Sequence, residues 1–224
     1  MDALQVIARI HTELPEKFGV PRQSGLVPQL RGRIVFEPAY RNPDAVRGLE
    51  DFSHLWLIWQ FSEAVRESWS PTVRPPKLGG NRRVGVFATR SPFRPNAIGL
   101  SSVRLHRVEY GTYEGAVLHI SGADLMDGTP IFDIKPYLAY TDSHPEASGS
   151  FALAGDAVRV ECAEGVLDAL PQEKRETLLR VLAQDPRPGY QHEAGRIYGF
   201  PFGGFEVRFT VADGVLTVLS AEKV

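Results

Sequence analysis

Before residue 160 the chain is a succession of short apolar and β-branched segments, separated by turn-forming residues, with little helical signal. Such segments predict strands, and we expect them at residues 4–12, 31–40, 49–61, 84–89, 98–108, 115–121 and 130–137. The Trp-rich segment 49–61 also suits a buried helix, because a continuous apolar run does not discriminate between the two. Residues 68–83, rich in proline and glycine, predict a long loop. Many strands joined by loops indicate a mainly β domain, and a closed or nearly closed barrel is the economical way to remove its edges.

The composition changes near residues 143–156, "SHPEASGSFALAGD", which are small, polar and turn-prone. Beyond this segment we expect the following elements: a strand at 156–163, a helix at 171–184, and strands at 195–200, 205–211 and 215–221. The helix signal is clear, because a proline stands at its start and three leucines, Leu178, Leu179 and Leu182, share one side. The sequence therefore predicts a β-barrel-like domain at 1–150 and a small α+β domain at 151–224.

Bulk composition and short motifs exclude several classes of protein. The N-terminus lacks the cationic start and apolar core of a signal peptide, and no apolar stretch approaches the roughly 20 residues of a membrane span. We therefore expect a cytoplasmic protein without a membrane partner. Neither a Rossmann glycine motif, a P-loop nor a G-x-S-x-G elbow occurs. The six histidines show no metal-ligand spacing and Cys162 is the single cysteine, so we expect no metal.

Charge is segregated along the chain although the formal net charge is only −2. Residues 68–108 contain eight basic and no acidic residues, whereas residues 109–173 contain twelve acidic residues and only two basic ones. Segregation of this kind creates a local field that the near-neutral total conceals. Two interpretations stay open at this point: the two blocks pair with each other across a sheet, or the basic block attracts an anionic partner.

Three loops carry the residues best suited to chemistry, namely "PRQSG" at 21–25, "ATRSPFRPN" at 88–96 and "DLMDGTPIFDIKPY" at 124–137. Together they offer planar cations, an exposed aromatic ring in Phe93, carboxylates and a stiff backbone. This set suits a ligand with a purine, hydroxyls and a carboxylate, because arginine binds a carboxylate through two parallel hydrogen bonds. A purely structural role is the alternative for each residue. Asp127 suits bonding to its own turn, and Arg90 and Arg94 suit capping of carbonyl groups or pairing with nearby aspartates.

Several long segments resemble the TsaA/YaeB-like family, in order along almost the whole chain. They are "PDAVRGLEDFSHLWLI", "PPKLGG", "GVFATRSPFRPNAIGLS", "DLMDGTPIFDIKPYL", "VLAQDPRPGY" and "FEVRFTV". The family comprises tRNA N6-methyltransferases that act on threonylcarbamoyl-adenosine beside the anticodon, at position 37. The resemblance implies an S-adenosylmethionine-dependent enzyme built on a β-barrel. It also implies a homodimer with the cofactor near the subunit interface.

The resemblance transfers the family's cofactor-contacting positions onto this chain. They fall on the following residues: Pro21, Arg22, Gln23, Ser62, Glu63, Arg90, Leu100, Asp127, Gly128, Thr129 and Pro130. For catalysis we expect Asp127, or a carbonyl of its turn, to accept a hydrogen bond from the N–H of the target nitrogen, and Asn96 to orient the base.

The anticodon arm of tRNA is the expected partner of the basic block. Cations there hold phosphates, and a splayed base stacks on an aromatic ring. The residues that we expect to contact tRNA are Arg82, Arg83, Phe93, Arg94 and Tyr137. The C-terminal domain either adds tRNA contacts through Arg187, His192 and Arg196 or serves as a lid or a stabilising cap. A rival of another class is a non-catalytic RNA-binding module that senses S-adenosylmethionine with the same loops.

Overall fold

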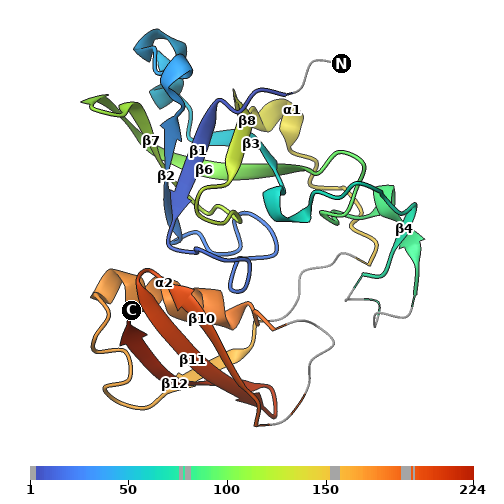
Figure 1. The fold of residues 1–224 in the computed structure, drawn as a ribbon, viewed down its shortest axis with the longest axis vertical. Helices are drawn as coiled ribbons and strands as arrows, with labels where there is room; N and C mark the ends of the chain where they lie inside the picture. The colour runs from blue at the N-terminus through green and yellow to red at the C-terminus, as the bar shows by residue number, and fades with distance from the viewer. Residues whose placement is uncertain (1–3, 76–77, 79–81, 152–156, 188–192, 194) are drawn as a thin grey trace.

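A closed barrel of six strands forms the larger part of the protein (Figure 1). The computed structural model describes residues 4–75, 78, 82–151, 157–187, 193 and 195–224. The barrel strands are β1 (Ala8–Thr12), β2 (Arg31–Phe36), β3 (His54–Gln60), β6 (Ile98–Thr112), β7 (Gly115–Ser121) and β8 (Pro130–Pro136). They close in the order β1–β2–β7–β6–β3–β8, and every pair of neighbours is antiparallel. The predicted mainly β, barrel-like fold is confirmed.

Alternation along the strands fills the barrel. In β3 the residues Leu55, Leu57 and Trp59 are buried, whereas the residues between them are only half-buried. Successive side chains of a strand point to opposite faces, so one face of β3 lines the core and the other faces outward. The strand interpretation of segment 49–61 is therefore correct, and a short 3-10 turn, η3 (Leu49–Asp51), precedes it.

Several strand predictions need correction. The first strand begins at Ala8 rather than at residue 4, and β3 covers only residues 54–60 of the segment 49–61. The segment 84–89 is not one strand: β5 (Val84–Gly85) pairs with β4 (Thr72–Val73), and the chain then turns through η6 (Val86–Ala88). Val86 is buried in this turn. The expected loop 68–83 thus contains β4. The second predicted strand ends at Phe36 rather than residue 40, because Pro38 cannot donate to a ladder and begins η1 (Pro38–Tyr40). The strand expected at 98–108 continues to Thr112, where a tight turn returns the chain into β7.

A smaller sheet follows the barrel in the chain, after α1 (Ala139–Asp142). Its strands are β9 (Arg159–Cys162), β10 (Ile197–Phe202), β11 (Phe205–Ala212) and β12 (Val215–Lys223), in the order β10–β11–β12–β9. The helix α2 (Gln172–Ala183) buries Leu178, Val181 and Leu182 against this sheet. The predicted small α+β domain is confirmed, although the boundary at residue 150 stays a prediction.

The connection between β1 and β2, residues 13–30, packs into the C-terminal sheet rather than into the barrel (Figure 1). Its residues Leu14, Val27 and Leu30 are buried in the same apolar cluster as Phe200 and Phe209. Its backbone also approaches closely, since a Cβ atom on Gly19 would lie 2.6 Å from the ring of Phe200. Residues 13–30 therefore belong to the barrel by sequence and to the C-terminal core by packing.

The connection is also tied to the C-terminal domain by polar contacts. Glu13 forms an ion pair of 3.1 Å with Lys174 of α2, and its carbonyl accepts from the N–H of Gly203 at 2.9 Å.

No helix in the described part of the chain is both long and apolar enough to cross a membrane.

Candidate functional site

All three predicted loops meet here, because Asp124, at the start of the third loop, lies beside a side-chain contact between the other two. Arg90, in the loop after η6, donates from Nη1 to the Oε1 atom of Gln23 in the β1–β2 connection. The amide of Gln23 in turn donates to the carbonyl of Arg22, which fixes its orientation. The arginine-bearing loop and the "PRQ" segment are thereby brought together.

A buried carboxyl group lies beside this contact. Asp124 is mostly buried, and its Oδ1 accepts from the hydroxyl of Ser101 at 2.5 Å. The same hydroxyl accepts from the indole N–H of Trp59 at 2.9 Å, so the carboxyl is linked to the barrel core. Burial raises the pKa of Asp124, whereas the Ser101 hydrogen bond and the positive charge of Arg90 oppose that rise. A desolvated carboxyl group next to a guanidinium is typical of functional sites.

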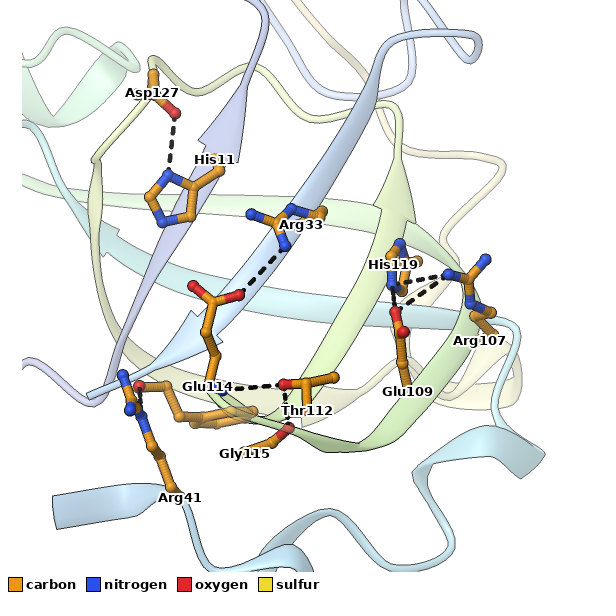
Figure 2. Close-up of polar contacts among 11 residues, drawn as sticks. His11, Arg33, Arg41, Arg107, Glu109, Thr112, Glu114, Gly115, His119 and Asp127 are labelled. Atoms are coloured by element: carbon orange, nitrogen blue, oxygen red, sulfur yellow. Dashed lines mark hydrogen bonds and ion pairs between the residues drawn. The ribbon is translucent and has the colours of Figure 1, made fainter. Parts of the chain in front are cut away.

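The aspartate turn at residues 127–130, further along the third loop, is fixed to β1. Asp127 Oδ1 accepts from the backbone N–H of Thr12 at 3.0 Å and lies 3.3 Å from Nδ1 of His11 (Figure 2). The N–H of Asp127 donates to the carbonyl of Leu14 at 2.8 Å, and that of Gly128 donates to the carbonyl of Ile10. Asp127 itself is exposed, and its contacts with Thr12 and His11 both use the Oδ1 atom.

The turn has the backbone that its sequence predicts. Gly128 adopts a φ of +74°, which non-glycine residues rarely tolerate. Thr129 is buried and closes the turn through its hydroxyl, which donates to the carbonyl of Met126 at 2.8 Å. Pro130, also buried, begins β8. The geometry makes Asp127 the exposed functional group of an otherwise fully bonded turn.

Arg22 of the "PRQ" segment faces the C-terminal domain. Its Nη2 atom donates to the carbonyls of Asp185 and Arg187, at 3.3 and 3.2 Å. Pro21 is buried and, with Arg22, borders a small cavity of about 70 Å³ against α2. These contacts of Arg22 hold the segment in place. The residue therefore has an anchoring role in the protein, which does not depend on contact with a ligand.

The other predicted site residues, directly after β3, on β6 and in the arginine-bearing loop, are exposed. Ser62 and Glu63 are exposed in η4 (Ser62–Ala64), directly after β3. Leu100 projects outward from β6 and is 57% exposed, which is unusual for a leucine in a barrel strand. Asn96 is exposed at the end of the arginine-bearing loop, and its carbonyl accepts from the N–H of Ile98.

The predicted tRNA contacts differ in their surroundings. Arg82 and Arg83 are exposed, and Arg83 donates to the hydroxyl of Thr72 at 2.9 Å. Phe93, expected to be exposed, is half-buried because the guanidinium of Arg66 lies 3.9 Å from its ring centroid. Arg94 is also half-buried and donates to the carbonyl of Thr89, which is the structural role considered above.

Tyr137 lies in an aromatic group on the outside of the barrel. Its ring centroid is 5.4 Å from that of Trp56 and 6.2 Å from that of His54. The indole N–H of Trp56 donates to Asp142 at 2.7 Å.

The C-terminal candidates Arg187 and Arg196 differ in their exposure. Arg187 is only 11% exposed and forms two 2.8 Å hydrogen bonds to the carboxylate of Asp185. Arg196 is exposed, lies over the ring of Tyr198 and pairs with Glu193 at 3.6 Å. His192 lies outside the described residues. Arg187 is thus committed to the protein itself.

Two features of this region are not predicted by the sequence motifs. Asp124 was expected only as a partner for an arginine, although its burial marks it as a site residue. Basic side chains at outward positions of β1, β2, β7 and β6 were also missed, because strand pairing is needed to place them side by side. Alternation in "ARIHT", "RGRIV" and "VLHIS" does carry part of that signal. No group of three His, Cys, Asp or Glu side chains suited to a metal ion occurs in the described part of the chain.

Comparison with known proteins identifies the family. The model of the tRNA-methyltransferase O N-terminal domain matches residues 9–143, and that of the TrmO C-terminal domain matches residues 156–224. The chain belongs to the TrmO family. It is 45% identical to the tRNA (adenine(37)-N6)-methyltransferase of Escherichia coli K12, with 96% of each chain covered. Another TrmO-like relative, the putative S-adenosylmethionine-dependent methyltransferase RcsF of Pseudomonas aeruginosa, is 42% identical over 91% of this chain and 90% of its own.

The fold of this TrmO family member is also found in solved structures. A crystal structure of TrmO from Pseudomonas aeruginosa matches with a TM-score of 0.79 and 34% sequence identity, covering 100% of this chain and 98% of the other. The match extends over both the barrel and the C-terminal sheet. The resemblance inferred from the sequence motifs is confirmed.

Proposed function

We propose that this protein transfers a methyl group from S-adenosylmethionine to N6 of adenine 37 in tRNA, and that the adenine carries the threonylcarbamoyl group. The observation that carries the proposal is the contact of Arg90 with Gln23 beside the buried Asp124. It joins two loops in which the family resemblance places cofactor contacts. A relative that matches 96% of the chain is named as a tRNA (adenine(37)-N6)-methyltransferase, which supports the N6 transfer to adenine 37.

The residues present fit the proposed cofactor. S-adenosylmethionine carries a carboxylate, an ammonium group, ribose hydroxyls and an adenine. The guanidinium of Arg90 suits the carboxylate, and the neighbouring carboxyl group of Asp124 suits the ammonium. Exposed Leu100 offers an apolar surface for the adenine, and the amide of Gln23 offers a hydrogen-bonding group. The backbone of Gly128 is already bonded to Ile10 and Arg9, so its proposed role is to let the turn approach the cofactor closely. We further propose that Pro21, Ser62, Glu63, Thr129 and Pro130 border the same site, and that Arg22 supports it.

The reaction asks the protein for positioning rather than for covalent chemistry. The bound cofactor supplies a methyl group already activated by its sulfonium, so the rate comes from orienting the nucleophile and excluding water. The target nitrogen is a weak nucleophile because its lone pair is delocalised into the purine. Asp127 accepts the hydrogen bond from its N–H in our proposal, because its Oδ2 atom makes no hydrogen bond with the residues that the structure describes, whereas Oδ1 accepts from Thr12. Asn96 orients the base.

We propose that the anticodon arm contacts the exposed cations Arg82 and Arg83, and that Tyr137 stacks against a base. Phosphate contacts of this kind are strong and sensitive to salt. Phe93 and Arg94 support the loop that carries Arg90 and contribute indirectly to RNA binding. A tRNA substrate agrees with a cytoplasmic location.

A homodimer also belongs to the proposal. Trp69 and Phe87 are 52% and 73% exposed, and their ring centroids are 6.1 Å apart. Large exposed aromatic pairs are uncommon on monomers and typify interfaces between proteins. A second copy of this chain is the proposed occupant. Phe87→Glu should shift the protein to a monomer in analytical ultracentrifugation.

One experiment separates the enzyme from the alternatives. The protein is incubated with methyl-labelled S-adenosylmethionine and with tRNA from cells that carry or lack the threonylcarbamoyl modification. Label transferred only to the modified tRNA supports the proposal. Cofactor binding without transfer points to a sensing module, and absence of cofactor binding contradicts both.

A further inference from the structure

A row of basic side chains crosses the outer wall of the barrel over four neighbouring strands. The strand register pairs His11 of β1 with Arg33 of β2, Arg33 with His119 of β7, and His119 with Arg107 of β6. Figure 2 shows these four side chains along the wall. We call them the basic row. Neighbouring strands are about 4.8 Å apart, so the row extends roughly 15 Å.

Histidine and arginine alternate along the basic row, so the permanent charges of Arg33 and Arg107 are separated by His119. Carboxylates lie at the edges of the row: Asp127 lies 3.3 Å from His11, Glu114 lies 3.3 Å from Arg33, and Glu109 lies 2.6 Å from His119. Glu109 also pairs with Arg107 at 3.1 Å. The side chains are thereby held in fixed orientations, which leaves the remaining donors of the guanidinium groups for a ligand.

Further cations lie beside the row and are not balanced in this way. Arg31 of β2 and Arg104 of β6 flank Ser121 in the register, and neither has an ion-pair partner among the residues that the structure describes. His106 lies between them and shares a 2.9 Å hydrogen bond with the Ser121 hydroxyl. Partial burial, followed by the charges of Arg31, Arg104 and His119, lowers the pKa of His106. The local potential is therefore positive.

These side chains border a pocket of about 450 Å³ on the outside of the barrel. Gly32 and Ile120 form part of its wall, and the polar lining consists of the following residues: His11, Thr12, Glu13, Arg31, Arg33, His106, Arg107 and His119. Glu13, the carboxylate in that lining, pairs with Lys174 through Oε1, whereas its Oε2 atom is buried without a hydrogen-bond partner in the described residues. The open donors of the pocket are thus mainly cationic or imidazole groups, which suit an anion.

We propose that this pocket binds an anionic group of the RNA substrate, beside the aspartate turn. This inference rests on the proposed function. His11 connects the two sites, because it lines the pocket and contacts Asp127. Two sources supply such an anion, namely a backbone phosphate of the anticodon arm or the carboxylate of the threonylcarbamoyl group. The carboxylate is a planar oxyanion and the phosphate is a tetrahedral one, and guanidinium groups bind both well.

The test measures tRNA binding and methylation by Arg31→Gln/Arg33→Gln. The matched control is Arg159→Gln/Arg208→Gln, which removes two cations from the C-terminal sheet. We expect the pocket variant to bind modified tRNA on the order of tenfold more weakly near 0.1 M salt, while the control and the affinity for S-adenosylmethionine stay unchanged. Arg31→Gln alone should show a smaller loss in the same direction. Because Arg31 has no ion-pair partner in the described residues, its removal should leave the fold intact.

Modified and unmodified tRNA distinguish the two sources. A phosphate in the pocket predicts equal weakening for both RNAs, with the slope of log K against log salt reduced by about 0.7 to 0.9 for each phosphate that is no longer bound. A carboxylate predicts weakening for modified tRNA alone. If neither Arg31→Gln nor Arg31→Gln/Arg33→Gln weakens the binding of either RNA, the proposal that the pocket binds an anion is wrong, even if the wild-type protein methylates tRNA. Absence of methylation by the wild-type protein is a separate result, which contradicts the proposed function instead.

Discussion

The guanidinium of Arg90 donates to the side-chain oxygen of Gln23, and so joins two loops that are 67 residues apart in sequence. Gln23 follows Arg22, which binds carbonyls of the C-terminal domain. Three parts of the chain are therefore connected through two adjacent residues. Any displacement of the C-terminal domain acts on the loop that we assign to the cofactor.

Arg90→Lys should weaken binding of S-adenosylmethionine by about tenfold. Lysine keeps the charge but lacks the planar fork that binds a carboxylate and the Gln23 oxygen together. Isothermal titration calorimetry measures the affinity, and Arg47→Lys, at an exposed ion pair elsewhere on the barrel, is the control. Equal affinity of the Arg90 variant and the wild type would contradict the assignment.

Asp127→Asn should lower the single-turnover rate of methylation by about a hundredfold, in the range of general acid–base contributions. The amide oxygen still accepts from Thr12, so the turn is retained. Rapid-quench measurement with saturating cofactor tests this, with Asp133→Asn on β8 as a control. An unchanged rate rules out the carboxylate as acceptor.

Replacing Arg82 and Arg83 with alanine should weaken tRNA binding at modest salt and leave cofactor binding intact. The two exposed guanidinium groups are proposed to hold phosphates, whose contribution falls as salt rises. Filter binding at several salt concentrations, with Arg159→Ala/Arg208→Ala for comparison, measures the effect. Equal tRNA affinity of the two double variants would remove these arginines from the RNA surface.

Gly99→Ala should destabilise the protein by about 1–3 kcal/mol or more, because a Cβ atom there would lie 2.2 Å from the indole of Trp59. Trp59 donates to Ser101, which donates to Asp124, so the variant should also weaken cofactor binding. Urea denaturation gives the free energy of unfolding. Gly85→Ala is the matched control, since a Cβ atom there meets open space. Equal stability of the two variants would show that Trp59 moves aside freely.

Asp185→Asn should reduce the free energy of unfolding at pH 7 by about 1–3 kcal/mol, because Arg187 loses its charged partner. Burial alone would raise the pKa of Asp185, but hydrogen bonds and charge from Arg187 outweigh it, and the net pKa is lowered. A lowered carboxyl pKa contributes stability above the unfolded value near 3.9, and that contribution is lost as the pH falls through the folded value. The difference between wild type and variant should therefore shrink in denaturation experiments between about pH 5 and pH 3. A constant difference would contradict the ionic origin.

The sequence predicted the parts of the fold in which local pattern and final burial agree. Strand β3 and helix α2 are examples, since each has one apolar face that remains buried in the structure. The strand prediction for segment 84–89 was wrong because alternation of apolar residues also occurs where the chain turns. Here the chain turns at η6, and Val86 is buried in the turn.

The sequence motifs provided candidate residues for the site but not the contacts between them. The contact of Arg90 with Gln23 and the anchoring of Arg22 both join residues far apart in sequence, and no local pattern reveals such pairs. The same holds for the basic row, whose members come from four strands. Phe93 was expected to be free, whereas a cation from another segment, Arg66, covers it.

Leu14, Val27 and Leu30 complete an apolar cluster whose other members come almost entirely from residues after 157. A truncation at residue 150 would expose these three side chains and leave gaps among the aromatic rings that they contact. Neither fragment is therefore expected to behave as an independent folding unit. During evolution the C-terminal domain cannot be exchanged for another module unless the segment between β1 and β2 changes with it.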